Sequence, residues 1–454
     1  MTTEHALTFY RSVKEKLDAV GPGMCMAKWH QVTLHLENGH NHSCHHPATH
    51  QTQLDELENP GSLHNSRHKK YQRREMLEKR RPRECRYCWN IEDTVNSKDV
   101  FSDRVLKSAG YPMAELEDLV SAGWNANPYP TDMEVSFSTT CNFKCSYCSA
   151  DVSSSWMKEL KEHGSYPTEF PLITLQQISR SGKMPIPDRD PNPYIDAFWQ
   201  WWPDSYPHLK KIRITGGEPL LSPHTFKVFD WIIANPRPDL DLAVNSNMCV
   251  PPVLIQRFTE KVKIMLEAKA IKSFVLYTSC EAHGAHAEYI RNGMDYNEWL
   301  DNCKLFLTQV PDARVSLMST YNAMSVTSYV NFLIDMVQLK KTFNNRVIVD
   351  TVYMANPKMM SIDILPADYL IYIQQQLNYV KILHRNNTFG DWELHKIERI
   401  LEYFESRLTD PMPQLDMFRR DFKVFVDEHD RRRGTNFLET FPKMKDFYTL
   451  CEKS

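Results

Sequence analysis

The sequence contains no run of eighteen apolar residues, so it lacks the stretch that a membrane-spanning helix requires. Its first twenty residues are typical of a charged amphipathic helix and lack the uninterrupted apolar segment of a secretory signal. We therefore expect a cytoplasmic protein without a membrane contact. Thiols stay reduced in the cytoplasm, so clustered cysteines there are more often metal ligands or catalysts than disulfides. Cysteine is scarce, with eleven in 454 residues, and most of them fall into two groups.

A strong charge of either sign is also missing, since the formal net charge is -3. This balance argues against a protein that depends on attraction to polyanions such as nucleic acids. The segment 67–83 is a local exception, with nine Lys or Arg residues against two Glu. Our interpretation of this run is the solvated basic face of a helix. A contact with a nucleic acid or an acidic peptide is the alternative.

Internal repeats and low-complexity linkers are absent as well, so regions of the chain are distinguished by their composition and by their strand or helix patterns. A length of 454 residues exceeds one ordinary compact core and predicts two or three domains. Residues 1–128 are rich in His, Arg and Cys and show little strand periodicity. In residues 129–385, short apolar strand-like runs alternate with helical patterns, and residues 386–454 form a largely helical tail.

Strand-like runs recur along the central region, and helical segments such as 222–235 and 328–343 separate them. Strands joined by helical crossovers pair in parallel and leave their helices outside the sheet. The sequence therefore predicts an α/β fold with a parallel sheet. Its six predicted strands are 133–139, 210–216, 241–247, 273–279, 314–320 and 346–354.

Three cysteines, Cys141, Cys145 and Cys148, follow the first of these strands within eight positions. This places them at the carboxyl end of the sheet, where ligands collect in parallel α/β folds. Three thiolates leave one iron of an iron–sulfur cube without a protein ligand. Such an open position is typical of a site that binds a substrate or cofactor. A zinc site completed from elsewhere, or a set of inert buried cysteines, is the alternative.

The Cys-x3-Cys-x2-Cys spacing, with Tyr147 before the last cysteine, resembles the hallmark of the radical S-adenosylmethionine (SAM) superfamily. The resemblance implies a [4Fe-4S] cluster on the three cysteines, whose open iron binds SAM. One electron, from a donor such as flavodoxin or ferredoxin, then cleaves the sulfonium and releases a 5′-deoxyadenosyl radical that abstracts a hydrogen from the substrate. The family fold implied for residues 129–385 is a partial (β/α)6 TIM-like barrel. No catalytic residue beyond the cluster ligands is implied.

Further family elements follow the next strands. The segment "TGGEP", Thr215–Pro219, matches the turn that holds the methionine amino group. Glycines there allow close backbone approach, and carbonyls with a carboxylate can accept from an ammonium. The stretch around Glu281 departs from the family's Ser-x-Asp-Gly pattern, which leaves the role of Glu281 open. By resemblance, the residues that bind SAM are Tyr147, Gly216, Gly217, Glu218, Pro219, Asn245, Asn247, Ser279 and Arg291.

The N-terminal region holds a second cysteine set, made of Cys25, Cys44, Cys85 and Cys88. Four thiolates can close a metal site completely, as tetrahedral zinc or as a fully ligated iron–sulfur cluster. Together with Trp29, Gly39 and Trp89, the set resembles the "twitch" module of radical SAM proteins, placed here before the barrel. The resemblance implies an auxiliary [4Fe-4S] cluster, with zinc as the alternative. His45 stands where a second adjacent cysteine is often found, and it is either a ligand or a neighbour.

The substrate is the least specified part of this interpretation. Twitch-type domains commonly accompany enzymes that act on peptides, sugars or small metabolites, and our first hypothesis is radical modification of a peptide or protein side chain. The alternatives are a dehydrogenase for a sugar or nucleotide, an RNA-modifying enzyme, and a non-catalytic iron–sulfur binding protein. The intact cysteine loop and Gly-Gly-Glu-Pro turn argue against the last, and the net charge argues against a nucleic-acid partner.

Overall fold

A computed structural model describes residues 3–94 and 100–453 of the chain. Contacts within it group the chain into two compact units. The first is drawn from residues 1–138, 185–214 and 239–241, and the second from residues 139–184, 215–238 and 242–454. The three predicted domain ranges remain a prediction.

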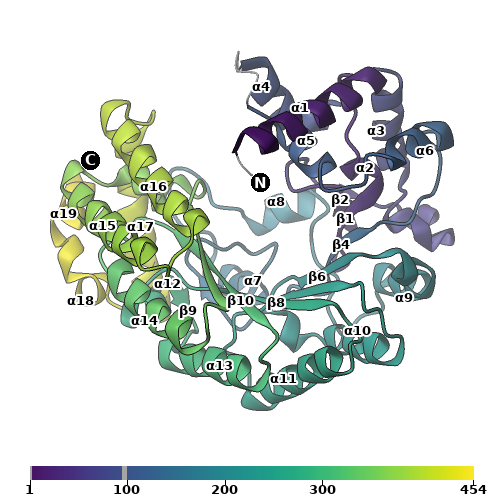
Figure 1. The fold of residues 1–454 in the computed structure, drawn as a ribbon. Coiled ribbons are helices and arrows are strands. Elements are labelled where there is room, and N and C mark those ends of the chain that lie inside the picture. The colour runs from purple at the N-terminus through teal and green to yellow at the C-terminus, as the bar shows by residue number, and fades with distance from the viewer. Residues whose placement is uncertain (1–2, 95–99, 454) are drawn as a thin grey trace. The chain divides into compact units, whose positions relative to one another are not determined.

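The first unit combines short helices with a set of strands (Figure 1). Its helices are α1 (Thr3–Val20), α2 (Ala27–His30), α3 (Arg67–Leu77), α4 (Arg86–Thr94), α5 (Asp103–Ser108), α6 (Glu115–Ala122) and α9 (Pro193–Ser205). Its strands are β1 (Gln31–His35), β2 (His40–His42), β3 (His50–Gln51), β4 (Asp132–Ser136) and β6 (Lys211–Thr215), which lie in the order β6-β4-β1-β2-β3.

Strand β1 was not predicted from the sequence. It pairs in parallel with β4, with Gln31 opposite Asp132 and His35 opposite Ser136. Its three central residues, 32–34, are all buried. Polar and apolar residues alternate from Gln31 to His35, which is the signal of a strand, but the run is only five residues long and lies among histidines and cysteines.

Helix α3 carries much of the basic run, and only part of that run is solvated. Ser66 caps the helix by accepting from the Lys69 amide. Arg74 is exposed, but the side chains of Lys69 and Arg73 are fully buried. Arg73 donates to the Lys28 carbonyl at 3.0 Å and to Asn65 at 2.8 Å. Most of the other basic residues of the run are exposed, so the predicted solvated basic face is present but does not include Lys69 and Arg73.

The second unit is an α/β arrangement followed by a helical C-terminal part (Figure 1). Its helices are α7 (Ser154–His163), α8 (Leu175–Arg180), α10 (Pro223–Ala234), α11 (Pro252–Glu267), α12 (Ala285–Ile290), α13 (Tyr296–Gln309), α14 (Tyr329–Thr342), α15 (Leu370–Arg385), α16 (Asp391–Thr409), α17 (Leu415–Arg433), α18 (Phe437–Thr440) and α19 (Lys445–Lys453). Its strands are β5 (Lys144–Cys145), β7 (Asp241–Asn245), β8 (Ser273–Ser279), β9 (Arg291–Asn292), β10 (Arg314–Tyr321) and β11 (Val347–Tyr353).

Strands β7, β8, β10 and β11 are neighbours in that order, and β10 pairs in parallel with both β8 and β11. Helices α11, α13 and α14 contact β8, β10 and β11. The buried residues Leu276, Leu317 and Val349 come from these strands, and Phe258 and Phe306 from the helices. The six predicted strands are all present, as β4, β6, β7, β8, β10 and β11. The prediction of an α/β fold with a mainly parallel sheet is confirmed.

In residues 3–94 and 100–453, none of the helices combines the length and the apolar character that crossing a membrane would need.

Candidate cluster and cofactor sites

The three cysteines of the central motif, Cys141, Cys145 and Cys148, are all half-buried. Burial raises the pKa of each thiol, that of Cys141 to about 12. The charge of Cys145 raises the pKa of the other two further, so the three sulfur atoms are close enough to interact. A bare thiolate is therefore unfavourable here, whereas a bound metal centre would stabilise it. This donor set fits a [4Fe-4S] cluster with three protein ligands.

The middle of the cysteine loop is anchored on two sides. On one side β5 pairs antiparallel with β9, which places Cys145 opposite Arg291, and the Ser146 amide donates to the Ile290 carbonyl at 2.7 Å. On the other side the indole N–H of Trp156 in α7 donates to the Cys145 carbonyl at 2.8 Å. The backbone around the central cysteine is thus fixed by two separate segments of the chain, residues 290–292 and helix α7.

Arg291 is buried beside this loop, and its guanidinium contacts protein groups. It donates to one oxygen of Glu281 at 2.7 and 3.1 Å, and to the sulfur of Cys145 at 3.7 Å. It also lies 5.5 Å from the ring centre of Tyr147, whose hydroxyl it contacts. The Tyr147 hydroxyl donates to Glu281 at 3.1 Å. The predicted contacts of Arg291 and Tyr147 with SAM remain predictions.

Glu281, whose role the sequence left open, lies at the centre of this group. It is fully buried, and burial raises its pKa while Arg291 acts in the opposite direction. Its Oε2 accepts from Arg291 and Tyr147, whereas its Oε1 has no hydrogen-bond partner among the described residues. A buried polar atom without a partner is costly, so this oxygen is suited to accept from a bound ligand. The signal in the sequence was its place just after β8.

The Gly-Gly-Glu-Pro turn packs directly against the start of the cysteine loop. A Cβ atom on Gly217 would lie 2.5 Å from the carbonyl oxygens of both Thr139 and Thr140. The Glu218 amide donates to the Thr140 carbonyl at 2.7 Å. Gly216 has a φ of 127°, which side-chain-bearing residues rarely adopt. Both glycines are therefore needed for this approach.

Glu218 ties the same turn to the segment after β7. One carboxylate oxygen accepts from the Ser246 hydroxyl at 2.9 Å and from the Leu220 amide at 3.0 Å. The other accepts from the Asn247 amide at 2.6 Å. Burial raises the pKa of Glu218 to about 7. Both oxygens are engaged within the protein, and the predicted contact of Glu218 with the SAM ammonium remains a prediction.

The remaining predicted cofactor residues lie on neighbouring segments. The Asn247 amide group donates to Asn142 of the cysteine loop at 2.8 Å. The Pro219 carbonyl accepts from a threonine hydroxyl at 2.7 Å. Asn245 and Ser279 are the last residues of the adjacent strands β7 and β8, and both are half-buried. The structure brings Asn247 to the cysteine loop and places Asn245 and Ser279 at one edge of the sheet.

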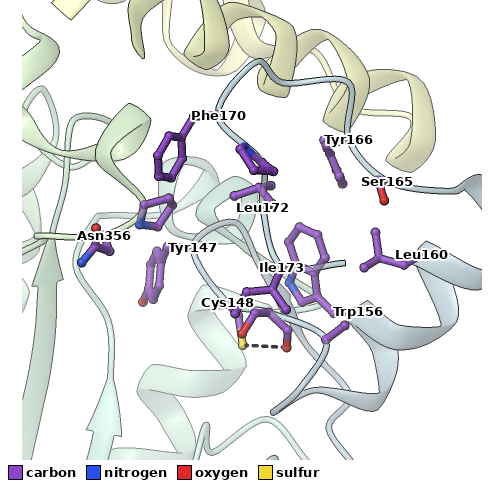
Figure 2. A pocket seen from close by; sticks show the side chains of 14 residues that line it. Tyr147, Cys148, Trp156, Leu160, Ser165, Tyr166, Phe170, Leu172, Ile173 and Asn356 are labelled. Carbon is purple, nitrogen blue, oxygen red and sulfur yellow. Dashed lines mark hydrogen bonds between the residues drawn. The ribbon is translucent and has the colours of Figure 1, made fainter. Parts of the chain in front are cut away.

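A cavity of about 280 Å³ opens beside the last cysteine of the loop (Figure 2). The side chains around it are aromatic, aliphatic or small and polar, and none of its described lining residues carries a charge. It suits an uncharged group that must lie close to Cys148. Its lining includes Tyr147, Cys148, Trp156, Tyr166, Phe170 and Asn356.

The four N-terminal cysteines come together around a second cavity. Cys25 precedes α2, Cys44 follows β2, and Cys85 and Cys88 lie at the start of α4. Burial raises the pKa of Cys85 to about 12 and that of Cys88 to about 11, and the charges of Cys25 and Cys44 raise both further. Four interacting thiols around one cavity fit a closed metal site.

Two buried cations border this cavity. Lys28 and Arg104 line it, and their side chains are 5% and 1% exposed. Burial would lower the pKa of Lys28, but the charges of Cys85 and Glu84 raise it above its usual value. Both cations also pair with carboxylates, Lys28 with Glu84 and Arg104 with Glu92, so they can offset only part of the negative charge of four thiolates. The donor set and its surroundings therefore suit a thiolate-bound metal centre.

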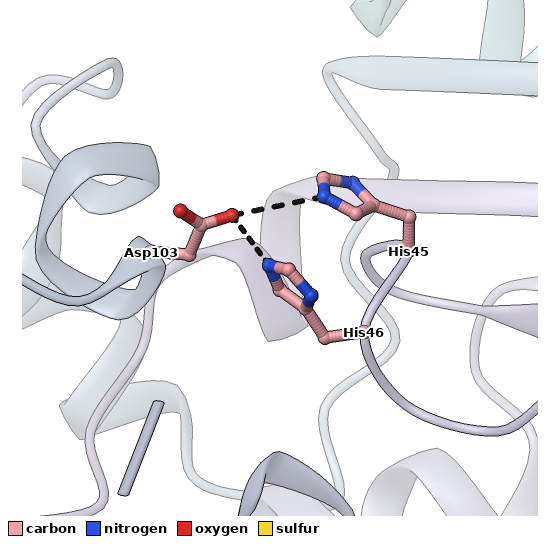
Figure 3. Close-up of side chains that lie close together, drawn as sticks. All are labelled: His45, His46 and Asp103. Carbon is pink, nitrogen blue, oxygen red and sulfur yellow. Dashed lines mark hydrogen bonds and ion pairs between the residues drawn. The ribbon is translucent and has the colours of Figure 1, made fainter. Parts of the chain in front are cut away.

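The histidines after Cys44 form a polar group at the rim of the cavity (Figure 3). His46 contacts the carboxylate of Asp103 at 2.7 Å, and His45 lies 3.8 Å from the same oxygen. The Lys107 ammonium contacts His45 at 3.1 Å and lies 3.8 Å from Asp103. His46, Asp103 and Lys107 line the cavity and the exposed His45 does not, and the role of His45 as a ligand or a neighbour remains a prediction.

No family model matches this chain. Among curated proteins, it is 30% identical over 115 residues to a GTP 3′,8-cyclase of Sulfurimonas denitrificans, which is 25% of this chain and 26% of the relative. It is 27% identical over 128 residues to a GTP 3′,8-cyclase of a Sulfurovum species, which is 28% of this chain and 30% of the relative. The chain thus spans less than a third of the length of the curated relatives that it matches.

Among solved structures, Streptococcus suis SuiB bound to SAM aligns with a TM-score of 0.32 and 14% identity, covering 79% of this chain and 69% of SuiB. SuiB bound to the precursor peptide SuiA aligns with a TM-score of 0.33 and 13% identity, covering 80% and 70%. The GTP 3′,8-cyclases are themselves radical SAM proteins. Their similarity agrees with the spacing of the three gathered thiols and with the glycine-rich turn packed on them. Over about a quarter of the chain, the comparison therefore agrees with the resemblance to the radical S-adenosylmethionine superfamily that the motifs carry.

Proposed function

We propose that this protein is a radical SAM enzyme that abstracts a hydrogen atom from a peptide or protein side chain. The proposal rests on the direct contact between the cysteine loop and the glycine-rich turn. The loop of Cys141, Cys145 and Cys148 is locked to the Gly-Gly-Glu-Pro turn by the close approach of Gly217 and by the hydrogen bond of Glu218. When bound, the [4Fe-4S] cluster supplies the electron that splits SAM into methionine and the 5′-deoxyadenosyl radical.

The protein's own residues hold and orient the reactants. The three thiolates hold the cluster, and the Arg291 guanidinium donates to one of their sulfur atoms. The uncharged cavity beside Cys148 excludes water from the radical and accommodates uncharged parts of the cofactor and substrate. Glu281 Oε1, buried and without a described partner, is suited to accept from a hydroxyl or ammonium of the bound cofactor.

The N-terminal cysteines form, in this proposal, a twitch-type module with an auxiliary [4Fe-4S] cluster, and a zinc ion is the alternative. The gathering of the four thiols around one cavity, with Lys28 and Arg104 in its lining, supports a thiolate centre of either kind. The central strands and helices form a partial (β/α)6 barrel. Electrons come from a small donor such as flavodoxin or ferredoxin.

A second candidate substrate class is a nucleotide, because the curated relatives are named for an activity on GTP. The uncharged lining of the cavity favours a peptide side chain over a triphosphate, which requires basic residues or a metal ion to bind it. RNA modification and a purely binding role are less supported, since two of the basic residues of α3 are buried and the cysteine loop is intact.

The test is anaerobic reconstitution with iron and sulfide, followed by reduction in the presence of SAM. We expect 5′-deoxyadenosine to form, and Cys145→Ala to abolish its formation because the catalytic cluster loses one of its three ligands. SAM that binds without cleavage would instead identify a binding protein. Product formation that rises with GTP, and not with peptides, would replace the peptide proposal by the nucleotide one.

A further inference from the structure

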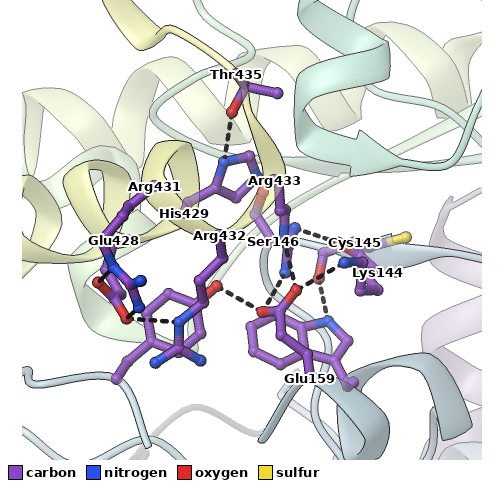
Figure 4. A network of polar contacts seen from close by, with 12 residues as sticks. Lys144, Cys145, Ser146, Glu159, Glu428, His429, Arg431, Arg432, Arg433 and Thr435 are labelled. Atoms are coloured by element: carbon purple, nitrogen blue, oxygen red, sulfur yellow. Dashed lines mark hydrogen bonds and ion pairs between the residues drawn. The ribbon is translucent and has the colours of Figure 1, made fainter. Parts of the chain in front are cut away.

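The last turn of α17 carries three arginines with different environments (Figure 4). Gly434 ends the helix in the left-handed conformation, and positive charges near a helix C-terminus are favourable. The side chain of Arg431 is 60% exposed and pairs with Glu428. The side chain of Arg433 is only 1% exposed. A cation buried to this extent is costly unless it is fully paired, so its contacts identify its role.

Arg433 is paired with α7 and with the cysteine loop at the same time. Its Nε and Nη2 donate to the two oxygens of Glu159 at 3.1 and 3.2 Å, a bidentate pair. Its Nη1 donates to the Lys144 carbonyl at 2.7 Å. The guanidinium also lies 5.0 Å from the ring centre of Trp156. Lys144 precedes Cys145, so Arg433 holds the backbone directly at the central cysteine of the motif.

Glu159 completes this arrangement as a buried carboxylate with further donors. The Lys144 ammonium and the Tyr166 hydroxyl each donate to it at 2.8 Å. Burial would raise the pKa of Glu159, but Arg433, Lys144 and Tyr166 outweigh it and bring that pKa down to about 2. Two cations thus face one ionised carboxylate, which leaves one net positive charge beside the cysteine loop.

Neighbouring carbonyls of the loop are therefore held by two helices far apart in sequence. The Lys144 carbonyl is bound by Arg433 in α17, and the Cys145 carbonyl by Trp156 in α7. We propose that Arg433 is a positioning residue for the catalytic cluster, which fixes the backbone at Cys145 and contributes positive charge to the cluster's surroundings. This inference rests on the proposed function and makes the C-terminal helical region part of the catalytic unit.

The experiment compares Arg433→Ala and Arg433→Lys with the wild-type full chain after anaerobic reconstitution. Arg431→Ala is the matched control, since it removes a neighbouring arginine that is exposed. The readouts are the midpoint potential of the catalytic cluster and the change in its EPR spectrum when SAM is added. The rate of 5′-deoxyadenosine formation is measured beside them.

We expect Arg433→Ala to shift the midpoint potential to more negative values, because the reduced cluster loses a stabilising positive charge. We also expect an altered EPR response to SAM and a loss of at least about tenfold in the cleavage rate, since small misplacements of reacting groups are costly. Arg433→Lys keeps the charge but not the bidentate geometry. It should therefore keep the potential while still lowering the rate.

A merely structural role would lower the yield of folded protein and leave the potential and the spectrum of the folded fraction unchanged. Wild-type values for both arginine variants, equal to those of Arg431→Ala, would overturn the inference. If Arg433→Ala does not fold, the result for Arg433→Lys decides alone, and a wild-type rate and spectrum would overturn it. A wild-type protein that forms no 5′-deoxyadenosine would instead refute the proposed function.

Discussion

Replacing Gly217 by alanine tests whether the glycine-rich turn positions the cysteine loop. The added Cβ would lie 2.5 Å from two carbonyl oxygens, those of Thr139 and Thr140, whereas ordinary contacts begin at 3.4 Å. The turn and the loop must therefore separate by about 0.9 Å, the difference between these two distances. The obstacle is backbone on both sides, so no flexible side chain can move aside.

The expected cost has two parts. Overpacking of this kind destabilises proteins by about 1–3 kcal/mol, which should lower the urea midpoint. Separation of the turn from the loop should also displace the cluster relative to bound SAM, and a misplacement of about 1 Å can lower a rate by about 10²-fold. The loss of SAM cleavage should therefore exceed what the loss of folded protein explains.

The assay measures urea unfolding and the rate of 5′-deoxyadenosine formation on the same reconstituted samples. Gly390→Ala is the matched control, because the nearest atom to its added Cβ is a flexible glutamate oxygen at 3.9 Å. We expect this control to match the wild type in both measurements. If Gly217→Ala forms 5′-deoxyadenosine at the wild-type rate, the packing of the turn does not set the position of the cluster.

Three further predictions concern other parts of the chain. Changing both Cys85 and Cys88 to Ala should lower the iron content from about eight to about four per chain, four being the content of one [4Fe-4S] cluster; one zinc per wild-type chain in metal analysis would refute the auxiliary cluster. Arg73→Ala should destabilise the protein by about 3 kcal/mol in urea unfolding, because buried acceptors lose their donor, whereas Arg74→Ala should stay within about 0.5 kcal/mol. Glu159 has a folded-state pKa of about 2, below its ordinary 4.5, so its ionised form contributes stability above pH 4.5 that is lost as the pH falls toward 2. The stability difference between wild type and Glu159→Gln should therefore shrink from pH 7 to pH 3, and a difference independent of pH would contradict this.

The sequence was most informative where a signal is local. The six central strands were predicted because their apolar runs are short and bounded by helical patterns, and strand β8 matches its predicted bounds, 273–279. The cysteine motifs were visible because cysteine is scarce. By contrast, β1 was missed although its residues alternate between polar and apolar, because the run is only five residues long and lies in a region rich in histidine and cysteine.

Contacts between residues far apart in the chain could not be predicted from one sequence. Arg291 was recognised as a site residue, but its carboxylate partner in the fold is Glu281, at a position that departs from the family pattern. The sequence did not predict that Arg433 is buried while Arg431 is exposed. The burial of an arginine depends on its partners in the fold, and one sequence does not show those partners. The same holds for Arg73 in the basic run of α3.

The contact between Arg433 and Lys144 also bears on how the protein is made. The two residues are 289 positions apart, and ribosomes add roughly 5–20 residues per second. After Lys144 is synthesised, roughly 15–60 s therefore pass before the arginine that holds its carbonyl exists. During synthesis the three thiols lie in a loop that lacks one of its anchors, open to oxidants and to the wrong metals. The loop has all of its anchors only after α17 has been synthesised, so delivery of iron and sulfide into the fully anchored site follows that point in translation.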